Sequence, residues 1–185
     1  GSVLIEEARS MKTTLDLIEG FRMDTGYLAS SFITNERTGM VEYDNPLILV
    51  TDDKVEHVEQ IYPTLELAAR ESRPLVLVAS EVEGQALAAL IMNSVRGTMK
   101  VCAVKAPRYG EERRKILRDL CLSIGATFIT REDGLQLKDI QLGQFGQSKS
   151  VSIGKLWTTI VGGKGDYDGI DKQIEALKAE ISQTE

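Results

Sequence analysis

Acidic and basic side chains follow the apolar segments of this chain in an order that could support phosphoryl chemistry. Asp52 and Asp53 follow one apolar segment, and Lys105 follows another. If these segments are strands of a parallel sheet, their carboxyl ends share the edge at which open α/β sheets bind ligands. Carboxylates there can hold Mg²⁺ and a lysine can neutralise a phosphoryl group, as in receiver-type domains. The structural alternative is that the aspartates cap a turn and Lys105 is solvated.

The remaining chemistry-bearing residues give weaker signals. A glycine-rich segment spans residues 161–166, but no Ser or Thr follows Lys164, so a hinge or turn is favoured over a phosphate-binding loop. His57 is the only histidine, and Cys102 and Cys121 are nineteen positions apart, so neither a zinc site nor a nucleophile–histidine pair is indicated. Both cysteines lie in apolar surroundings, which predicts buried, reduced thiols and a reducing compartment.

An apolar run from residue 86 to residue 92 is the unusual feature of the chain. At about 100° per residue, seven apolar side chains cover the whole circumference of a helix. Such a helix is either wholly buried or presents apolar surface to a partner, and periodicity alone favours neither. Ile61, Tyr62 and Leu65 are similarly arranged around Pro63 in the preceding helical segment.

The elements that position these residues alternate from residue 46 onward. Apolar segments typical of buried strands are 46–51, 74–79, 99–104 and 126–130, and segments with helical spacing are 55–72, 81–96 and 111–124. The alternation predicts an α/β fold with a mainly parallel sheet and flanking helices. Residues 13–45 predict irregular strands or hairpins, and residues 148–161 predict additional antiparallel strands.

Residues typical of helix caps refine the predicted helix boundaries. Ser80 and Glu83 have the spacing of a capping box, which predicts a helix start near residue 81. Gly97 and Gly125 follow the next two helical segments, where a left-handed residue commonly ends a helix. Residues 170–181 carry an apolar stripe that predicts a final amphipathic helix.

Composition restricts the classes of partner. The chain has 185 residues, with 22 Lys and Arg against 28 Asp and Glu, for a formal charge of −6. This length suits one domain with a real core, and the acidic balance disfavours nucleic-acid binding. The longest apolar run is far shorter than the roughly 20 residues that span a bilayer, which disfavours membrane insertion.

Several segments closely resemble the apical domain of group I chaperonins, the GroEL type. The resemblance runs from about residue 13 to residue 161, with the segments in family order and family spacing. They are Glu19-Gly-Phe-Arg-Met-Asp24, Gly26-Tyr-Leu28, Phe32-Ile33, Arg73-Pro74, Val82-Glu-Gly-Gln-Ala-Leu87, Met92-Asn93, Arg96-Gly97-Thr-Met-Lys100, Val104-Lys-Ala-Pro107, Gly110-Glu-Glu-Arg-Arg-Lys115 and Gly125-Ala-Thr127. Residues 1–12 are then expected to be a cloning scar and connecting segment. Residues 162–185 are expected to be a glycine-rich joint and the amphipathic helix.

The resemblance implies the polypeptide-binding part of a ring-forming, ATP-dependent folding chaperone, with the swivelling β/α/β fold of that domain. It implies that a groove between two helices binds unfolded polypeptides and the mobile loop of a co-chaperonin. The groove residues carried over by position are Tyr27, Phe32, Tyr62, Leu65, Leu87, Ile91 and Met92. ATP and Mg²⁺ would belong to the parent ring, so this fragment is expected to be a monomer without cofactor, metal or ATPase activity. The implied location is the cytoplasm, an organelle matrix or stroma, or a phage-infected bacterial cytoplasm.

Departures from the family pattern suggest a divergent member. Ser31 stands where an aromatic groove residue is usual, and Tyr62 stands at an aliphatic position of the first groove helix. The usual Gly-Phe-Gly turn reads Arg108-Tyr109-Gly110, and a common Asp-Thr-Thr-Thr segment reads Leu156-Trp157-Thr158-Thr159. These changes bear on which substrates and which co-chaperonin the groove accepts.

Overall fold

A computed structural model describes residues 20–164 of the chain. The predicted N-terminal connecting segment (1–12) and C-terminal amphipathic helix (170–181) lie outside the described residues. The strands are β1 (Gly20–Met23), β2 (Val41–Asp44), β3 (Leu47–Val50), β4 (Lys54–Val55), β5 (Leu75–Ala79), β6 (Glu81–Val82), β7 (Val101–Lys105), β8 (Gly146–Gln147), β9 (Ser150–Ile153) and β10 (Thr158–Val161). The helices are α2 (Val58–Glu71), α3 (Gly84–Arg96) and α4 (Gly110–Ile124), with short 3₁₀ turns η1 (Ser30–Phe32), η2 (Leu137–Asp139) and η3 (Leu142–Gln144).

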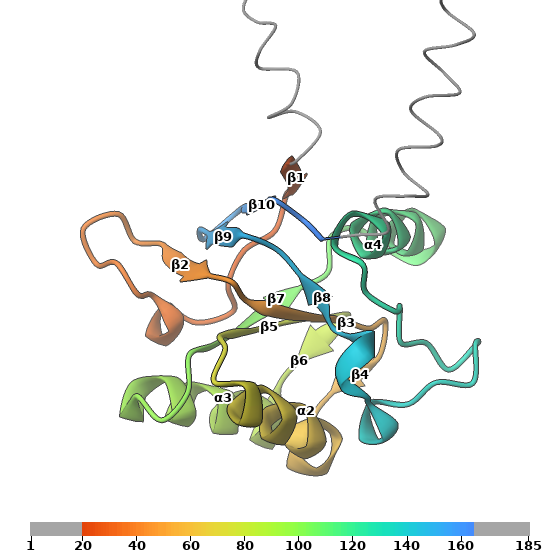
Figure 1. Ribbon diagram of the computed structural model, residues 1–185, viewed down its shortest axis with the longest axis horizontal. Helices are drawn as coiled ribbons and strands as arrows, with labels where there is room; N and C mark the ends of the chain where they lie inside the picture. Colours follow the sequence, from red (N-terminus) through yellow and green to blue (C-terminus); the bar gives the residue numbers. More distant parts are fainter. Residues whose placement is uncertain (1–19, 165–185) are drawn as a thin grey trace, which may run out of the picture.

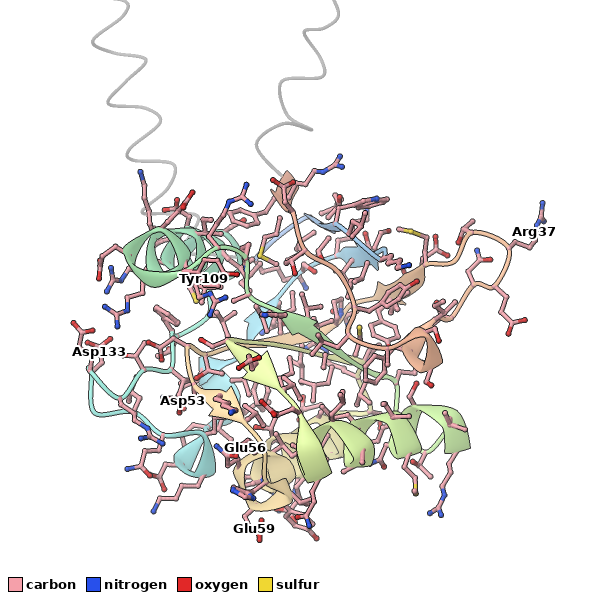
Figure 2. The ribbon with its side chains drawn as sticks, turned by 180° about the vertical axis from the view of Figure 1, so that it is seen from behind. Arg37, Asp53, Glu56, Glu59, Tyr109 and Asp133 are labelled. Carbon is pink, nitrogen blue, oxygen red and sulfur yellow. The ribbon has the colours of Figure 1, made fainter. Side chains whose placement is uncertain are left out.

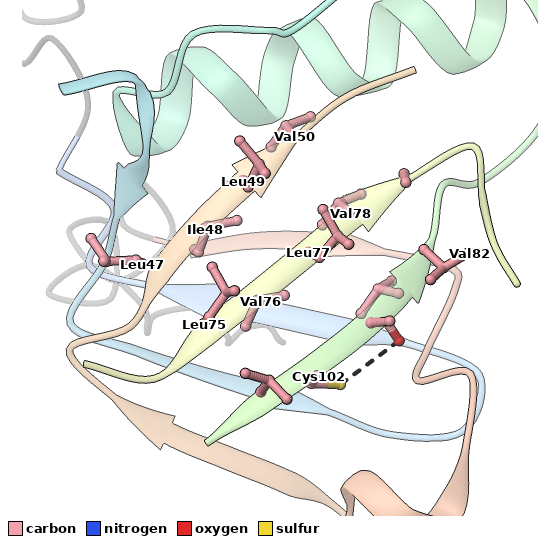
Figure 3. Packing of buried hydrophobic residues seen from close by; sticks show 14 of the residues in the cluster. Leu47, Ile48, Leu49, Val50, Leu75, Val76, Leu77, Val78, Val82 and Cys102 are labelled. Atoms are coloured by element: carbon pink, nitrogen blue, oxygen red, sulfur yellow. Dashed lines mark hydrogen bonds between the residues drawn. The ribbon is translucent and has the colours of Figure 1, made fainter. Parts of the chain in front are cut away.

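The central sheet has the strand order β7-β5-β3-β8. The strands β3, β5 and β7 are parallel, and β8 pairs antiparallel at one edge. Every residue of β3 and β5 is buried, as expected for strands covered on both faces, and Figure 3 shows their side chains among the core residues. The predicted parallel α/β core is therefore confirmed.

The apolar segment 126–130 is not a full fourth strand, which corrects the sequence prediction. It contributes one parallel bridge, between Thr51 and Ile129, where the Thr51 hydroxyl also donates a hydrogen bond to the Ile129 carbonyl (2.8 Å). Directly after it, residues 131–134 form a turn in which Gly134 has a positive φ of 73°. Because the chain turns away directly after residue 130, the pairing beside β3 ends at this single bridge.

The antiparallel strands form a separate sheet with the order β1-β10-β9-β2. The strands predicted within residues 148–161 are present as β9 and β10, and the segment before residue 46 supplies the two edge strands β1 and β2. Gly26, which follows β1, lies against the backbone of Gly154 and Lys155, just before β10. A Cβ at this position would overlap the Gly154 carbonyl oxygen, so glycine is required here.

The layers follow from this arrangement (Figure 1). Helices α2 and α3 cover one face of the central sheet, while α4 and the antiparallel sheet lie on the other face. Cys102 on β7 and Cys121 on α4 are both buried and unpaired, as predicted. Among residues 20–164, no helix is long and apolar enough to cross a membrane.

The helix ends confirm two predictions and correct a third. Gly97 and Gly125 end α3 and α4 with a left-handed φ of 73° each. The Ser80–Glu83 capping box is wrong, because the residues of β6 pair with β4 and α3 begins only at Gly84. The Ser80 hydroxyl instead donates to the Asp52 carbonyl.

Candidate functional site

An apolar pocket of about 310 Å³ lies between α2 and α3 on the outer side of the helical layer. On α2, Val58, Tyr62 and Leu65 are spaced at i, i+4 and i+7, so they form one stripe along the helix. The pocket is lined by Val58, Tyr62, Leu65, Glu66, Ala89, Asn93 and Met99. The lining is mostly apolar, and Glu66 is its only charged side chain.

Helix α2 is oriented so that the Tyr62 side chain faces solvent and is not buried. Ile61, Thr64 and Ala68 form its buried face, and Tyr62 is 61% exposed. The start of the helix is fixed by Gln60, whose side-chain oxygen accepts hydrogen bonds from the N–H groups of Glu56 (2.8 Å) and His57 (2.9 Å). An exposed aromatic ring beside an apolar pocket is the arrangement that polypeptide-binding surfaces commonly use.

Helix α3 explains the apolar run that the sequence singled out. Ala86 and Leu90 are buried against the sheet, and Met92 on the outer arc is 50% exposed. Ala89 and Asn93, on the flank toward α2, line the pocket. The helix is therefore neither wholly buried nor uniformly exposed.

Apart from Glu66, the pocket lining contains one polar side chain, Asn93, and its hydrogen bonds are made within the protein. The Asn93 amide donates to the Ala89 carbonyl (2.8 Å), and the amide oxygen accepts from the Thr98 hydroxyl (2.9 Å). An apolar partner can cover Asn93 without leaving these two interactions unmade.

The predicted groove residues do not share one cavity. Tyr62 and Leu65 line the pocket, and Met92 is exposed on the outer arc of α3. Leu87 and Ile91 lie about 160° around α3 from the pocket-lining pair Ala89 and Asn93, by helical geometry. They are half-buried and pack against the core.

The other two predicted groove residues, Tyr27 and Phe32, lie outside the pocket and pack within the fold. Phe32, in η1, is fully buried, and η1 packs against α3. Tyr27 is half-buried, bridges to Val104 of β7, and donates its hydroxyl hydrogen to the Gly39 carbonyl (3.2 Å). Because their side chains are engaged in this way, neither contributes to the lining of the pocket.

Sequence reasoning missed five of the lining residues. These are Val58, Glu66, Ala89, Asn93 and Met99. Val58 and Glu66 are each four residues from Tyr62, so taking one helical turn to either side of Tyr62 would have found the two on α2. No comparable signal marks the two on α3, because apolar residues surround that helix.

The acidic set at the sheet edge is held in ion pairs. A carboxylate oxygen of Asp52 lies 3.9 Å from Arg114, and one of Asp53 lies 3.5 Å from Arg131. Burial raises the pKa of Asp53. The positive charge of Arg131 lowers this pKa, and the negative charge of Asp52 raises it further. Lys105 ends β7, two strands from β3 and so about 10 Å away across the sheet.

Asp53 also faces a polar pocket of about 360 Å³ that Arg131 and Lys138 help to line. Within residues 20–164, no three His, Cys, Asp or Glu side chains are grouped closely enough to hold a metal ion. The sheet edge thus presents ion-paired charges, with Arg114 also close to Glu111 (2.7 Å) and Glu132 (3.6 Å), whereas the pocket between α2 and α3 presents connected apolar surface. A comparison of the chain with protein-family models finds no match.

Proposed function

We propose that this chain is the apical, polypeptide-binding domain of a divergent group I chaperonin. In this proposal the pocket between α2 and α3 binds exposed apolar segments of unfolded polypeptides and the mobile loop of a co-chaperonin. The observation that carries the proposal is the apolar pocket beside Tyr62, whose ring is largely exposed. ATP and Mg²⁺ act elsewhere in the parent ring, in the cytoplasm or an organelle, and the domain itself is a binding module without catalytic activity.

The size of the pocket is consistent with weak and adaptable binding. Burying about 200 Å² of apolar surface at roughly 25 cal/mol per Å² contributes about 5 kcal/mol before any cost is counted. Ordering a flexible chain consumes much of this, so one domain should bind with a Kd of about micromolar or weaker. Met99 in the lining and Met92 beside it have flexible side chains that can fit partners of different shape. In a ring, several such sites would hold one chain together.

A tyrosine on the other side of the molecule provides a matched control. Tyr109, at the start of α4, is 80% exposed and lies on the opposite side of the sheet from α2 (Figure 2). Tyr62→Ser should weaken binding of a fluorescein-labelled peptide, Gly-Ser-Gln-Leu-Ile-Phe-Leu-Ser-Gly, by about 5- to 30-fold, which corresponds to about 1–2 kcal/mol of lost apolar contact. Tyr109→Ser should leave the affinity unchanged. Tyr62→Ser should keep the melting temperature within about 1 °C, because the Tyr62 ring is exposed. Tyr109 is the N-cap residue of α4, where serine is a favoured residue, so Tyr109→Ser should not lower the melting temperature.

Fluorescence anisotropy measures the affinity, and circular dichroism measures the melting temperature. No binding by the wild-type chain, or equal weakening by the two serine variants, would contradict the proposed function. Substitutions of Leu87 or Ile91 are less informative, because these half-buried side chains support the fold. A charge at either position is expected to destabilise the domain whether or not the pocket binds a partner.

A further inference from the structure

The exposed face of α2 beside the pocket, here called the lip, consists of Glu59, Tyr62 and Glu66. It carries two carboxylates, one on either side of the exposed aromatic ring. Glu59, Tyr62 and Glu66 are spaced at i, i+3 and i+7, so they follow one face of the helix. All three are exposed, and Tyr62 and Glu66 also line the apolar pocket. Figure 2 shows Glu59 at the outer edge of the molecule, directed away from the sheet.

The charge of this lip is only partly compensated. Glu66 has Arg70 one turn away, at 3.8 Å between charged atoms and with both side chains exposed. None of the ion pairs formed within residues 20–164 includes Glu59. The facing outer arc of α3 presents Gln85, Ala88 and Met92, which carry no charge, and it ends at the exposed Arg96, one turn beyond Met92. An occupant of the pocket therefore meets net negative charge along α2 and no charge along most of α3.

Pro63 adds a further acceptor at the same place. Proline has no backbone N–H, so the Glu59 carbonyl lacks the donor that residue i+4 normally supplies in a helix. The lip thus offers two carboxylates and the face of an aromatic ring, next to a carbonyl that lacks its helical donor. Each of these groups attracts a cation, and a lysine or arginine side chain can reach them while its aliphatic stem rests on apolar surface.

We propose that the groove selects apolar segments that carry a lysine or arginine, whose cationic group lies against Tyr62 between Glu59 and Glu66. This inference rests on the proposed polypeptide-binding function and names the sequence class that the site prefers. The apolar side chains of the segment occupy the pocket, and the basic residue next to them reaches the lip of α2. The charge complementarity discriminates among apolar segments that the pocket alone would bind equally.

Three matched peptides test the preference. The probe is Gly-Ser-Lys-Leu-Ile-Phe-Leu-Ser-Gly, and its partners have Gln or Glu in place of Lys. At low ionic strength the Lys peptide should bind the wild-type chain about five- to tenfold more tightly than the Gln peptide, as expected for an exposed charge contact combined with a cation–π contact. The Glu peptide should bind most weakly. In about 0.5 M salt the difference between the Lys and Gln peptides should fall below about twofold, because screening acts on exposed charges.

Glu59→Gln is the sharpest variant, because Glu59 has no ion pair to disturb among the described residues. This variant should bind the Lys peptide about threefold more weakly than the wild-type chain does, and its affinity for the Gln peptide should be unchanged. Glu71→Gln is the matched control: Glu71 is an exposed glutamate on the same helix, about 180° around it from Tyr62. This control should change neither affinity.

The outcomes separate the two proposals. If no peptide binds the wild-type chain, the polypeptide-binding function itself fails. If the Gln and Lys peptides bind equally, or if Glu59→Gln weakens both alike, the pocket binds polypeptide but the cation preference is overturned. Tightest binding of the Glu peptide would also overturn it, and would place charge selection at Arg96 and Lys100 beyond the other end of the groove.

Discussion

Thr64 offers a direct measure of how well the helix beneath the groove is packed. Its side chain is 1% exposed, and its hydroxyl oxygen has no hydrogen-bond partner. Burying a hydroxyl without a partner costs about 1–3 kcal/mol in proteins. Valine has nearly the same shape and a similar helix propensity, so Thr64→Val should remove the cost without creating a cavity. We expect the free energy of unfolding to rise by about 1–2 kcal/mol.

Urea unfolding followed by circular dichroism measures this change. The midpoint should rise with an unchanged m-value, and the melting temperature should rise by roughly 2–8 °C for a chain of this size. Thr64→Ser is the control, because it keeps the hydroxyl and removes the methyl group; it should lower stability by about 1 kcal/mol. Peptide affinity should not change in either variant, since Thr64 lies about 160° around α2 from Tyr62.

The result that refutes this reasoning is a loss of stability in Thr64→Val comparable to that in Thr64→Ser. The hydroxyl would then have a partner in solution, such as a water molecule, and its removal would break an interaction. The two variants are thus expected to change stability in opposite directions.

Three further predictions concern other parts of the fold. Gly26→Ala should lower the free energy of unfolding by more than about 2 kcal/mol in a urea titration, because the added Cβ overlaps a backbone oxygen; a neutral effect would contradict the close approach. Burial raises the pKa of Cys121 to about 12 and also raises the pKa values of Cys102 and Tyr43. The charge of Cys102 raises the pKa of Tyr43 further. The folded state therefore keeps protons that the unfolded state releases, and the urea midpoint should fall progressively above about pH 8.5; a flat profile up to pH 10.5, in steps of about half a unit, would refute this. Acetyl phosphate with Mg²⁺ should shift the melting temperature of wild type and Asp52→Asn equally or not at all, whereas a shift confined to wild type would favour the receiver-like alternative.

The three parallel strands β3, β5 and β7 and the ends of α3 and α4 could be predicted because their signals are local. Continuous apolar segments read as buried parallel strands, and Gly97 and Gly125 end their helices as expected. The Ser80–Glu83 motif failed because pairing between β4 and β6 outweighs a local capping signal. That pairing brings together residues about 27 positions apart, which no short window of sequence reveals.

The candidate groove could be predicted only on one of its two helices. On α2, the stripe that contains Tyr62 and Leu65 adjoins the buried face, and the polar residues Glu59, Glu66 and Arg70 lie beyond it, so periodicity identifies both. On α3, apolar residues occur all round the helix, and sequence alone gives no preferred flank. The contact of α3 with η1 places Leu87 and Ile91 away from the pocket and leaves Ala89 to line it.

The pairing of β1 with β10 has a mechanical consequence. Gly20, where the described region begins, lies opposite Val161, three residues before this region ends. A force applied between these two points acts across the ladder and loads its hydrogen bonds one after another, whereas a force along the strands would load them together. Tension between Gly20 and Val161 would therefore peel β1 away at low force, while the central sheet and the pocket on its far side remain intact.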